Sequence, residues 1–265
     1  MRLQDRPTLR ANASVTFPDF LQGARAVRAI GQAGLHPSNC RLLDPGEALT
    51  AGAGGGDEAV LVLAFESADH PLDAWMQRTL ECCRDHGGKV PEGAGKTRTD
   101  DASSREGAAG AWRQSFLGAP YLRDALVGMG LVSDTFETAI PWNRFEAFHA
   151  GVMAAAEEAV QRICGAGSVT CRFTHVYPDG PAPYYSVIAA SKRGSQLAHW
   201  DEIKAAASEA LLRLGGTITH HHAVGRDHRP WYDRQRPPLF AAALKAAKSA
   251  LDPRAIMNPG VLIDP

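Results

Sequence analysis

The feature that most constrains the fold is an order of helix and strand patterns that occurs twice along the chain. Each half begins with a β-prone run, continues with a helical apolar pattern and two more β-prone runs, and then has a second helical pattern. The predicted strands cover residues 14–17, 39–43, 59–65, 131–139, 168–176, 184–190 and 216–220, and the predicted helices cover 18–33, 72–83, 141–163, 197–214 and 239–251.

Both halves therefore approximate β-α-β-β-α-β, the ferredoxin-like order. The halves share no visible sequence identity, so the repeat concerns element order alone. This order predicts an α+β fold with a large antiparallel sheet and helices on one face. We expect eight or more strands and four main helices. Residues 92–111 are polar and aperiodic, which predicts a loop.

Composition excludes several classes of protein. The 265 residues are 45% hydrophobic and 22% charged, as in globular proteins. A net charge of −1 gives no general attraction to nucleic acid or to an anionic membrane. The longest apolar run, residues 59–65, is far shorter than the ~20 residues of a membrane-spanning helix. The N-terminus lacks a secretory signal and the five cysteines contain no C-x-x-C pair, so we expect reduced thiols and a cytoplasmic location.

The histidines carry the strongest chemical signal. His220, His221 and His222 follow a double glycine and a short β-prone run, which predicts imidazoles at a strand end that opens into a loop. Imidazoles transfer protons near neutral pH, so these residues are candidates for acid–base catalysis. From spacing alone, a polar loop without a catalytic role remains equally open. No cysteine pair or His-Glu-x-x-His helix completes a tetrahedral zinc site.

Two further sites carry weaker signals. Tyr184 and Tyr185 lie on a predicted strand that could run beside the histidines, although tyrosines of half-buried strands are common. Arg123 could bind an anionic substrate group through its planar guanidinium, although a surface pair with Asp124 is the simpler interpretation.

At these positions the sequence resembles a known family. It is similar, over nearly its whole length, to the C-terminal cap domain of alkylglycerone-phosphate synthases (alkyldihydroxyacetonephosphate synthases). These belong to the vanillyl-alcohol-oxidase type of FAD-linked oxidases. The matching segments are SVTFPDF at 14–20, YLRD at 121–124, FETAIPW at 136–142, THVY at 174–177, GGTITHHHAVG at 215–225 and NPG at 258–260.

The resemblance implies an FAD-dependent transferase of ether-lipid biosynthesis. In that family the flavin is expected to bind the dihydroxyacetone-phosphate carbon while a fatty alcohol replaces the acyl group. The resemblance assigns proton transfer to Tyr185 and the histidine run, and substrate binding to Arg123. It assigns cofactor binding to Asn258, in the ending shared by the wider group. We expect Tyr185 and at least one histidine of residues 220–222 to open into one cavity.

The resemblance also implies two departures from relatives. Related 2-hydroxy-acid dehydrogenases have a glutamate and a further histidine that complete a divalent metal site. This chain keeps His175 but lacks that glutamate, so we expect no metal. The family's glycine-rich FAD-binding domain is not found here either, so the chain reads as a fragment that begins at Met1 and binds FAD weakly by itself. Residues 1–225 would form the cap domain, and residues 226–265 a tail that packs against the missing domain.

The expected partners are a small-molecule or lipid-phosphate substrate and an FAD-binding domain, supplied upstream or in trans, without nucleic acid or a transmembrane segment. An uncovered tail would favour a homodimer. Two alternatives stay open: an FAD-linked oxidoreductase of a 2-hydroxy acid, and a non-catalytic ferredoxin-like binding module.

Overall fold

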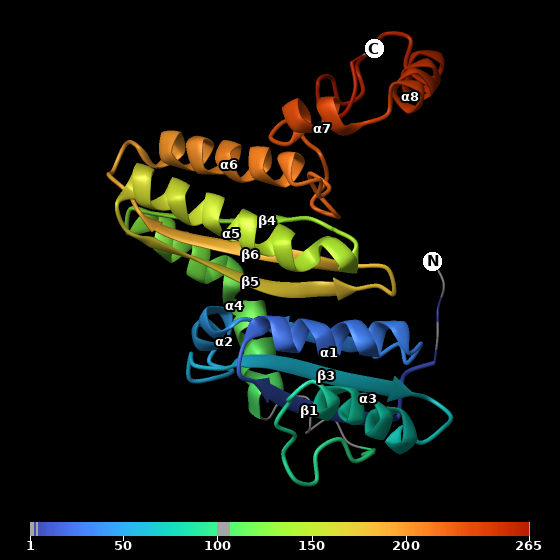
Figure 1. Cartoon of the computed structure of the whole chain (residues 1–265). Helices are drawn as coiled ribbons and strands as arrows, with labels where there is room; N and C mark the ends of the chain where they lie inside the picture. The colour runs from blue at the N-terminus through green and yellow to red at the C-terminus, as the bar shows by residue number, and fades with distance from the viewer. Residues whose placement is uncertain (1–2, 4, 100–106, 265) are drawn as a thin grey trace.

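A single antiparallel sheet forms the centre of the molecule (Figure 1). The structure is a computed structural model that describes residue 3, residues 5–99 and residues 107–264. Its strands are β1 (Leu9–Phe17), β2 (Asn39–Leu43), β3 (Ala59–Ser67), β4 (Leu131–Glu137), β5 (Gly167–Val176) and β6 (Pro181–Ala190). They lie in the order β1-β3-β2-β5-β6-β4.

The sheet repeats one arrangement in its two halves. In each half the first strand lies beside the third, and the third beside the second: β1-β3-β2 and β4-β6-β5. The halves meet where their second strands, β2 and β5, pair at Leu43 and Arg172. The predicted α+β fold with a large antiparallel sheet is confirmed.

Six strands are present in the described part of the chain, so the expectation of eight or more is wrong. After the second helix of the first half, the chain makes only isolated bridges with β1, at Lys89 and Arg98. Residues 216–220 form no strand either. The reason is that their backbone N–H groups have other partners. Gly216 and Thr217 donate to the single carbonyls of Leu211 and Ala139, and Ile218 donates to the side chain of Gln235.

Helices cover both faces of the sheet, with the four long helices of the repeat on one face. These four are α1 (Phe20–Gln32), α3 (Asp73–Asp85), α5 (Trp142–Cys164) and α6 (Gln196–Arg213). Their buried residues join those of the sheet in one large hydrophobic cluster. On the other face, α2 (Pro45–Thr50) and α4 (Gly107–Gly128) pack through a smaller cluster that includes Ala48 and Trp112.

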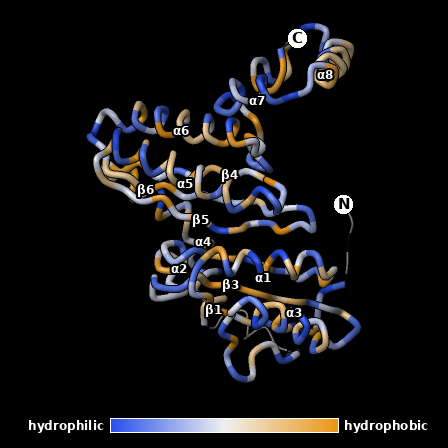
Figure 2. Tube along the Cα trace, in the orientation of Figure 1, coloured by the Kyte–Doolittle hydropathy of each residue, from blue (hydrophilic) through white to orange (hydrophobic). Residues whose placement is uncertain are grey.

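Strand β3 shows why both faces are covered. Leu61 and Leu63 belong to the large cluster, whereas Val60 and Val62 belong to the small one, because successive side chains of a strand point to opposite faces. A strand buried on both sides is apolar at successive positions, as residues 59–65 of β3 are, and β3 is among the most hydrophobic segments in Figure 2.

Helix α4 was not predicted from the sequence. Part of the loop expected over residues 92–111, residues 100–106, lies outside the described residues, and the helix begins at Gly107. Trp112 is its only buried residue among those described, and Pro120 lies inside it. A helix with one buried side chain has no apolar stripe, so periodicity could not reveal it.

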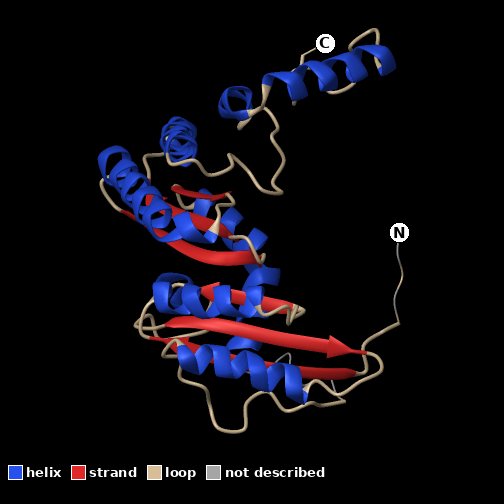
Figure 3. Cartoon of the chain, turned by 45° about the vertical axis from the view of Figure 1, so that its right-hand side comes forward, coloured by secondary structure: helices blue, strands red, loops and turns tan. Residues whose placement is uncertain are grey.

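The last two helices extend away from the sheet (Figures 1 and 3). They are α7 (Arg229–Gln235) and α8 (Pro238–Leu251), and neither contains a buried residue. Arg234 of α7 forms an ion pair with Glu209 of α6, at an Nη1–Oε2 distance of 2.7 Å. The division into residues 1–225 and 226–265 stays a prediction. No helix among the described residues has the length and apolarity to span a membrane.

Candidate active site

The three consecutive histidines lie in an irregular loop between α6 and α7. Gly216, where this loop leaves α6, is packed so closely that a Cβ would lie 2.6 Å from Phe148 and 2.7 Å from the Thr138 hydroxyl. Thr138 also donates a hydrogen bond to the carbonyl of Thr217, 2.6 Å away. The loop is therefore fixed against the end of β4.

Glu137, the last residue of β4, holds the histidine loop through one carboxylate oxygen. Oε1 accepts the backbone N–H groups of His220 at 3.2 Å, of His222 at 2.7 Å, and of His221 between them. The Glu137 side chain is fully buried. A buried carboxylate is stable only when donors satisfy it, and here the donors are the backbone of the loop itself.

The second oxygen of Glu137 faces the imidazoles. Oε2 lies 3.0 Å from Nδ1 of His221 and 3.7 Å from Nδ1 of His220. No well-aligned donor reaches it among the described residues. Burial raises the pKa of Glu137, but the N–H of His221 and the neighbouring His222 outweigh that effect and leave its pKa lowered. Glu137 is therefore an anion next to the histidines.

Side chains from β5 complete the cluster. The ring centroid of His175 lies 4.8 Å from that of His221 and 5.3 Å from that of His220. The hydroxyl of Tyr177, just after β5, lies 3.1 Å from Nε2 of His220. Burial lowers the pKa of His175, and the neighbouring His221 and His220 lower it further. At neutral pH His175 is therefore a neutral imidazole that can accept a proton.

The expectation of no metal rested on a missing carboxylate, and that reason does not hold. Glu137, His221 and His222 place ligand-type atoms within 4.8 Å of one another, and so do His175, His220 and His221. The carboxylate comes from a strand 83 to 85 residues earlier in the chain. Imidazole nitrogens and a carboxylate are ligands that zinc accepts. That the site holds no metal stays a prediction.

The structure corrects the expected position of the tyrosine. Tyr185 is fully buried on the face of the sheet that carries the long helices, where its ring stacks on Phe136. Its hydroxyl lies 3.2 Å from Nδ1 of His149 on α5. Burial raises the pKa of Tyr185 well above its usual value. The expectation that Tyr185 opens into one cavity with the histidine run is therefore wrong.

Of the two adjacent tyrosines on β6, Tyr184 is the one that meets the histidines. Its ring lies 5.2 Å from that of His222, in a T-shaped contact. Its hydroxyl donates to Oγ1 of Thr135, 2.9 Å away. The physical reason is the alternation of side chains along β6, which sends Tyr184 and Tyr185 to opposite faces.

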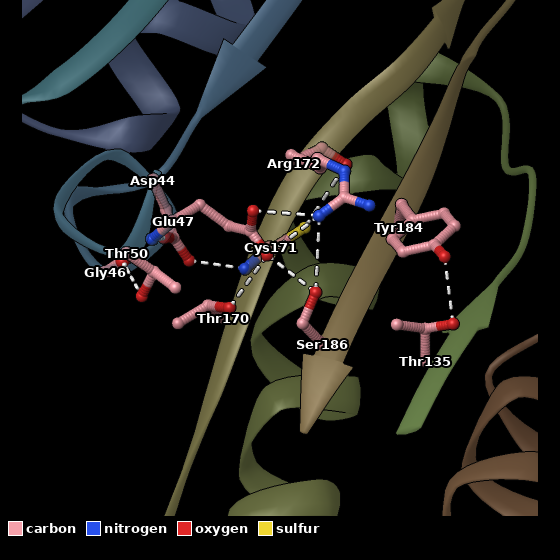
Figure 4. A network of polar contacts seen from close by, with 10 residues as sticks. All are labelled: Asp44, Gly46, Glu47, Thr50, Thr135, Thr170, Cys171, Arg172, Tyr184 and Ser186. Carbon is pink, nitrogen blue, oxygen red and sulfur yellow. Dashed lines mark hydrogen bonds and ion pairs between the residues drawn. The ribbon is translucent and has the colours of Figure 1, made fainter. Parts of the chain in front are cut away.

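Tyr184 also belongs to a polar network at the junction of the two halves (Figure 4). The guanidinium of Arg172 lies 4.0 Å from the centroid of the Tyr184 ring. Arg172 donates two hydrogen bonds to Glu47 of α2, at 2.8 and 3.0 Å, and Ser186 donates a third at 2.6 Å. This network fixes the ring that packs against His222.

The other two predicted residues lie apart from this cluster. Arg123 is exposed on α4. Asn258 is exposed in the segment after α8, with a positive φ of 48°. Among the described residues, neither has a hydrogen bond or ring contact with the histidine loop. Their assigned roles stay predictions.

Arg41 is a candidate that the sequence analysis missed. It lines a cavity of about 320 Å³, between β2 and the end of β5, together with His175 and Tyr177. Its guanidinium lies 5.5 Å from the centroid of Trp112. Burial, and then the charge of Arg172, lower its pKa. No carboxylate in the described part of the chain pairs with Arg41, so it is a cation available to an anionic ligand. The sequence signal that could have revealed Arg41 is its charge within the short, largely apolar run predicted as a strand over residues 39–43.

Comparisons with known proteins identify the family of the chain. The family "FAD linked oxidases, C-terminal domain" matches residues 6–262. The chain therefore belongs to the C-terminal domain family of FAD-linked oxidases, and FAD is the cofactor of this family.

Three relatives carry the name alkyldihydroxyacetonephosphate synthase, and two of them illustrate the match. The protein of Caenorhabditis elegans is 27% identical over 284 residues, which cover 97% of this chain and 46% of the relative. That of Trypanosoma brucei brucei is 24% identical and is covered to 45%. A solved alkyldihydroxyacetonephosphate synthase superposes with a TM-score of 0.71 at 14% identity, over 97% of this chain and 44% of the other. The chain thus spans less than half the length of these relatives.

Proposed function

We propose that this chain is the substrate-binding and proton-transferring portion of an FAD-dependent enzyme that exchanges an acyl group for an alkyl group on dihydroxyacetone phosphate. The reaction would make it a transferase of ether-lipid synthesis. The observation that carries the proposal is the half-exposed histidine cluster, with a buried anion behind it and the unpaired cation Arg41 in the adjoining cavity.

The cluster has groups for each part of this chemistry. Removal of a proton from a substrate carbon needs a base near neutrality, and an imidazole supplies one. His221 is an accessible candidate, because its side chain is 48% exposed, against 19% for His220. Arg41 is suited to the phosphate of the substrate, since a guanidinium binds phosphate oxygens through paired N–H groups. Tyr185, which is fully buried, would act through the core rather than on substrate.

The described residues fit only part of an FAD site. The exposed rings of Tyr177 and of His221 in the histidine loop could face a flavin ring. When bound, the flavin would supply an electron-accepting centre. The glycine-rich residues 51–57 lead into strand β3, not into a helix whose N–H groups would bind the pyrophosphate. In our proposal the remaining contacts come from an FAD-binding domain, against which residues 226–265, including Asn258, would pack.

The test joins this chain to the FAD-binding half of an alkyldihydroxyacetonephosphate synthase and measures incorporation of labelled fatty alcohol. We expect exchange that falls at least about 100-fold in His221→Ala, the lower range for a lost acid–base group. The matched control is His70→Asn, whose side chain is as exposed as that of His221, at 48%, and which lies outside the cluster and the Arg41 cavity.

Two outcomes would contradict the proposal. A chimera that binds FAD but exchanges no alcohol would reject it. A chimera that instead oxidises a 2-hydroxy acid with reduction of a dye would favour the oxidoreductase.

A further inference from the structure

Each of the three histidines can carry its proton on either ring nitrogen, and the contacts of the cluster constrain that choice. A neutral imidazole has one N–H donor and one lone pair, and its neighbours decide which nitrogen carries which. Glu137 is the neighbour with the clearest preference, because an ionised carboxylate accepts hydrogen bonds and donates none.

The position of Oε2 sets the proton on His221. This oxygen lies 3.0 Å from Nδ1 of His221. The contact is not aligned as a hydrogen bond, but a lone pair on Nδ1 would still lie beside an anionic oxygen and be repelled, whereas the positive end of an N–H there is attracted. The proton of His221 therefore belongs on Nδ1.

The next contact agrees with this placement. Nδ1 of His221 also lies 2.9 Å from Nδ1 of His220, and a hydrogen bond between two nitrogens needs one donor and one acceptor. With the proton on His221, Nδ1 of His220 is the acceptor. The proton of His220 is then on Nε2, where it donates to the hydroxyl of Tyr177 at 3.1 Å.

We propose that Glu137 is a positioning residue that fixes both the backbone of the histidine loop and the tautomer of His221. With its proton held on Nδ1, His221 keeps the lone pair on Nε2, at the far side of the ring from Glu137. The side chain of His221 is 48% exposed while that of Glu137 is fully buried, so the basic nitrogen is the one open to a substrate. The catalytic role of this His221 nitrogen rests on the proposed function, whereas the assignment of the tautomer does not.

The conservative variant separates the two roles of the carboxylate. In Glu137→Gln the amide oxygen still accepts the three N–H groups of the loop, so the loop is retained. The amide nitrogen then takes the place of Oε2 and donates toward His221, which favours a lone pair on Nδ1 and a proton on Nε2. In Glu137→Ala both roles are lost.

The experiment uses the full chain, labelled with ¹⁵N-histidine and freed of metal ions with a chelator. Long-range ¹⁵N–¹H correlation spectra distinguish the two tautomers, and the loss of one set of signals in His221→Gln assigns that ring. We expect the Nδ1–H tautomer in the unaltered chain and the Nε2–H tautomer in Glu137→Gln. Glu146→Gln, which alters an exposed glutamate paired with Arg25, should leave the spectrum unchanged.

Two results would overturn the inference. One is an Nε2–H tautomer of His221 in the unaltered chain. The other is an unchanged tautomer in a Glu137→Gln protein whose circular dichroism shows the native fold. If the tautomer is as expected but His221→Ala leaves alkyl exchange intact in the chimera, the proposed function fails and the role of Glu137 stands.

Discussion

Individual residues in this chain have protonation properties that depend on which face of the sheet they occupy. Tyr185 and His149 form a pair within the core, whereas Tyr184 and His222 meet on the opposite face. Burial lowers the pKa of His149 from 6.5 to about 4. The core pair is therefore neutral at physiological pH, and its contribution is to stability rather than to proton transfer.

The lowered pKa of His149 predicts that the folded chain becomes less stable in acid. Between pH 6.5 and about 4 the unfolded chain binds a proton on His149 that the folded chain does not, so stability falls as the pH falls through this window. With about 1.4 kcal/mol per pKa unit, the loss is on the order of 3 kcal/mol. Urea unfolding between pH 7 and pH 4 measures it.

His149→Gln keeps a partner for the Tyr185 hydroxyl but cannot titrate. We expect this variant to lose less unfolding free energy in acid than the unaltered chain does, by about 3 kcal/mol. The exposed His36→Asn variant serves as control. Equal slopes in the His149→Gln and unaltered proteins would show that other groups cause the acid sensitivity.

At the scale of secondary-structure elements, the junction between β2 and β5 is the narrowest part of the sheet. In the part of the chain that the structure describes, Leu43 and Arg172 are the one pair of ladder residues across it. Asp44, the N-cap of α2, adds a hydrogen bond from the N–H of Cys171 to its carboxylate, at 2.5 Å. Glu47, one turn further on, binds the Arg172 side chain. Helix α2 thus ties the two halves together through side chains where the backbone ladder is short.

Glu47→Gln tests this connection. The Glu47 and Arg172 side chains are 8% and 13% exposed, and removal of one partner of a buried ion pair typically costs about 3 kcal/mol or more. We expect a loss of that size in the free energy of unfolding. Glu158→Gln breaks a pair with Arg162 in which both side chains are mostly exposed, and should cost less than about 0.5 kcal/mol. Equal stabilities of the two variants would show that the junction does not depend on Glu47.

At the scale of the whole molecule, the described chain is a folded sheet-and-helix body with an uncovered end. Leu239, Phe240 and Leu251 of α8 are 86%, 51% and 88% exposed. Exposed apolar side chains on an extended helix pair mark a surface for another protein or domain. The chain covers 44–46% of the relatives reported above, which leaves room for the FAD-binding domain that we propose as the partner.

This organisation predicts that the chain by itself is folded but binds FAD weakly and is catalytically silent. Cooperative thermal unfolding checks that the chain is folded. A titration with FAD, followed by quenching of flavin fluorescence, checks that it binds FAD weakly. We expect no stoichiometric complex at micromolar FAD with this chain alone. Tight binding with a stable yellow complex would contradict the need for a second domain.

The sequence by itself determined the order of the strands and long helices of the repeat, apart from the last predicted strand. The predicted helices over 18–33, 141–163 and 197–214 match α1, α5 and α6 closely, because their apolar residues repeat at helical spacing toward one buried face. It also singled out the histidine run. These features are local, so a short window of sequence contains them.

Only the tertiary structure decided what surrounds the histidines. The Glu137 carboxylate lies 83 to 85 residues away in sequence, and it accepts the N–H groups of residues 220–222 where the sequence predicted the end of a strand. Strand register placed Tyr184, rather than Tyr185, beside His222. The cation Arg41 reaches the site only because β2 and β5 meet. Such contacts depend on long-range pairing, where a shift of one residue would reverse every side chain, and no local pattern specifies them.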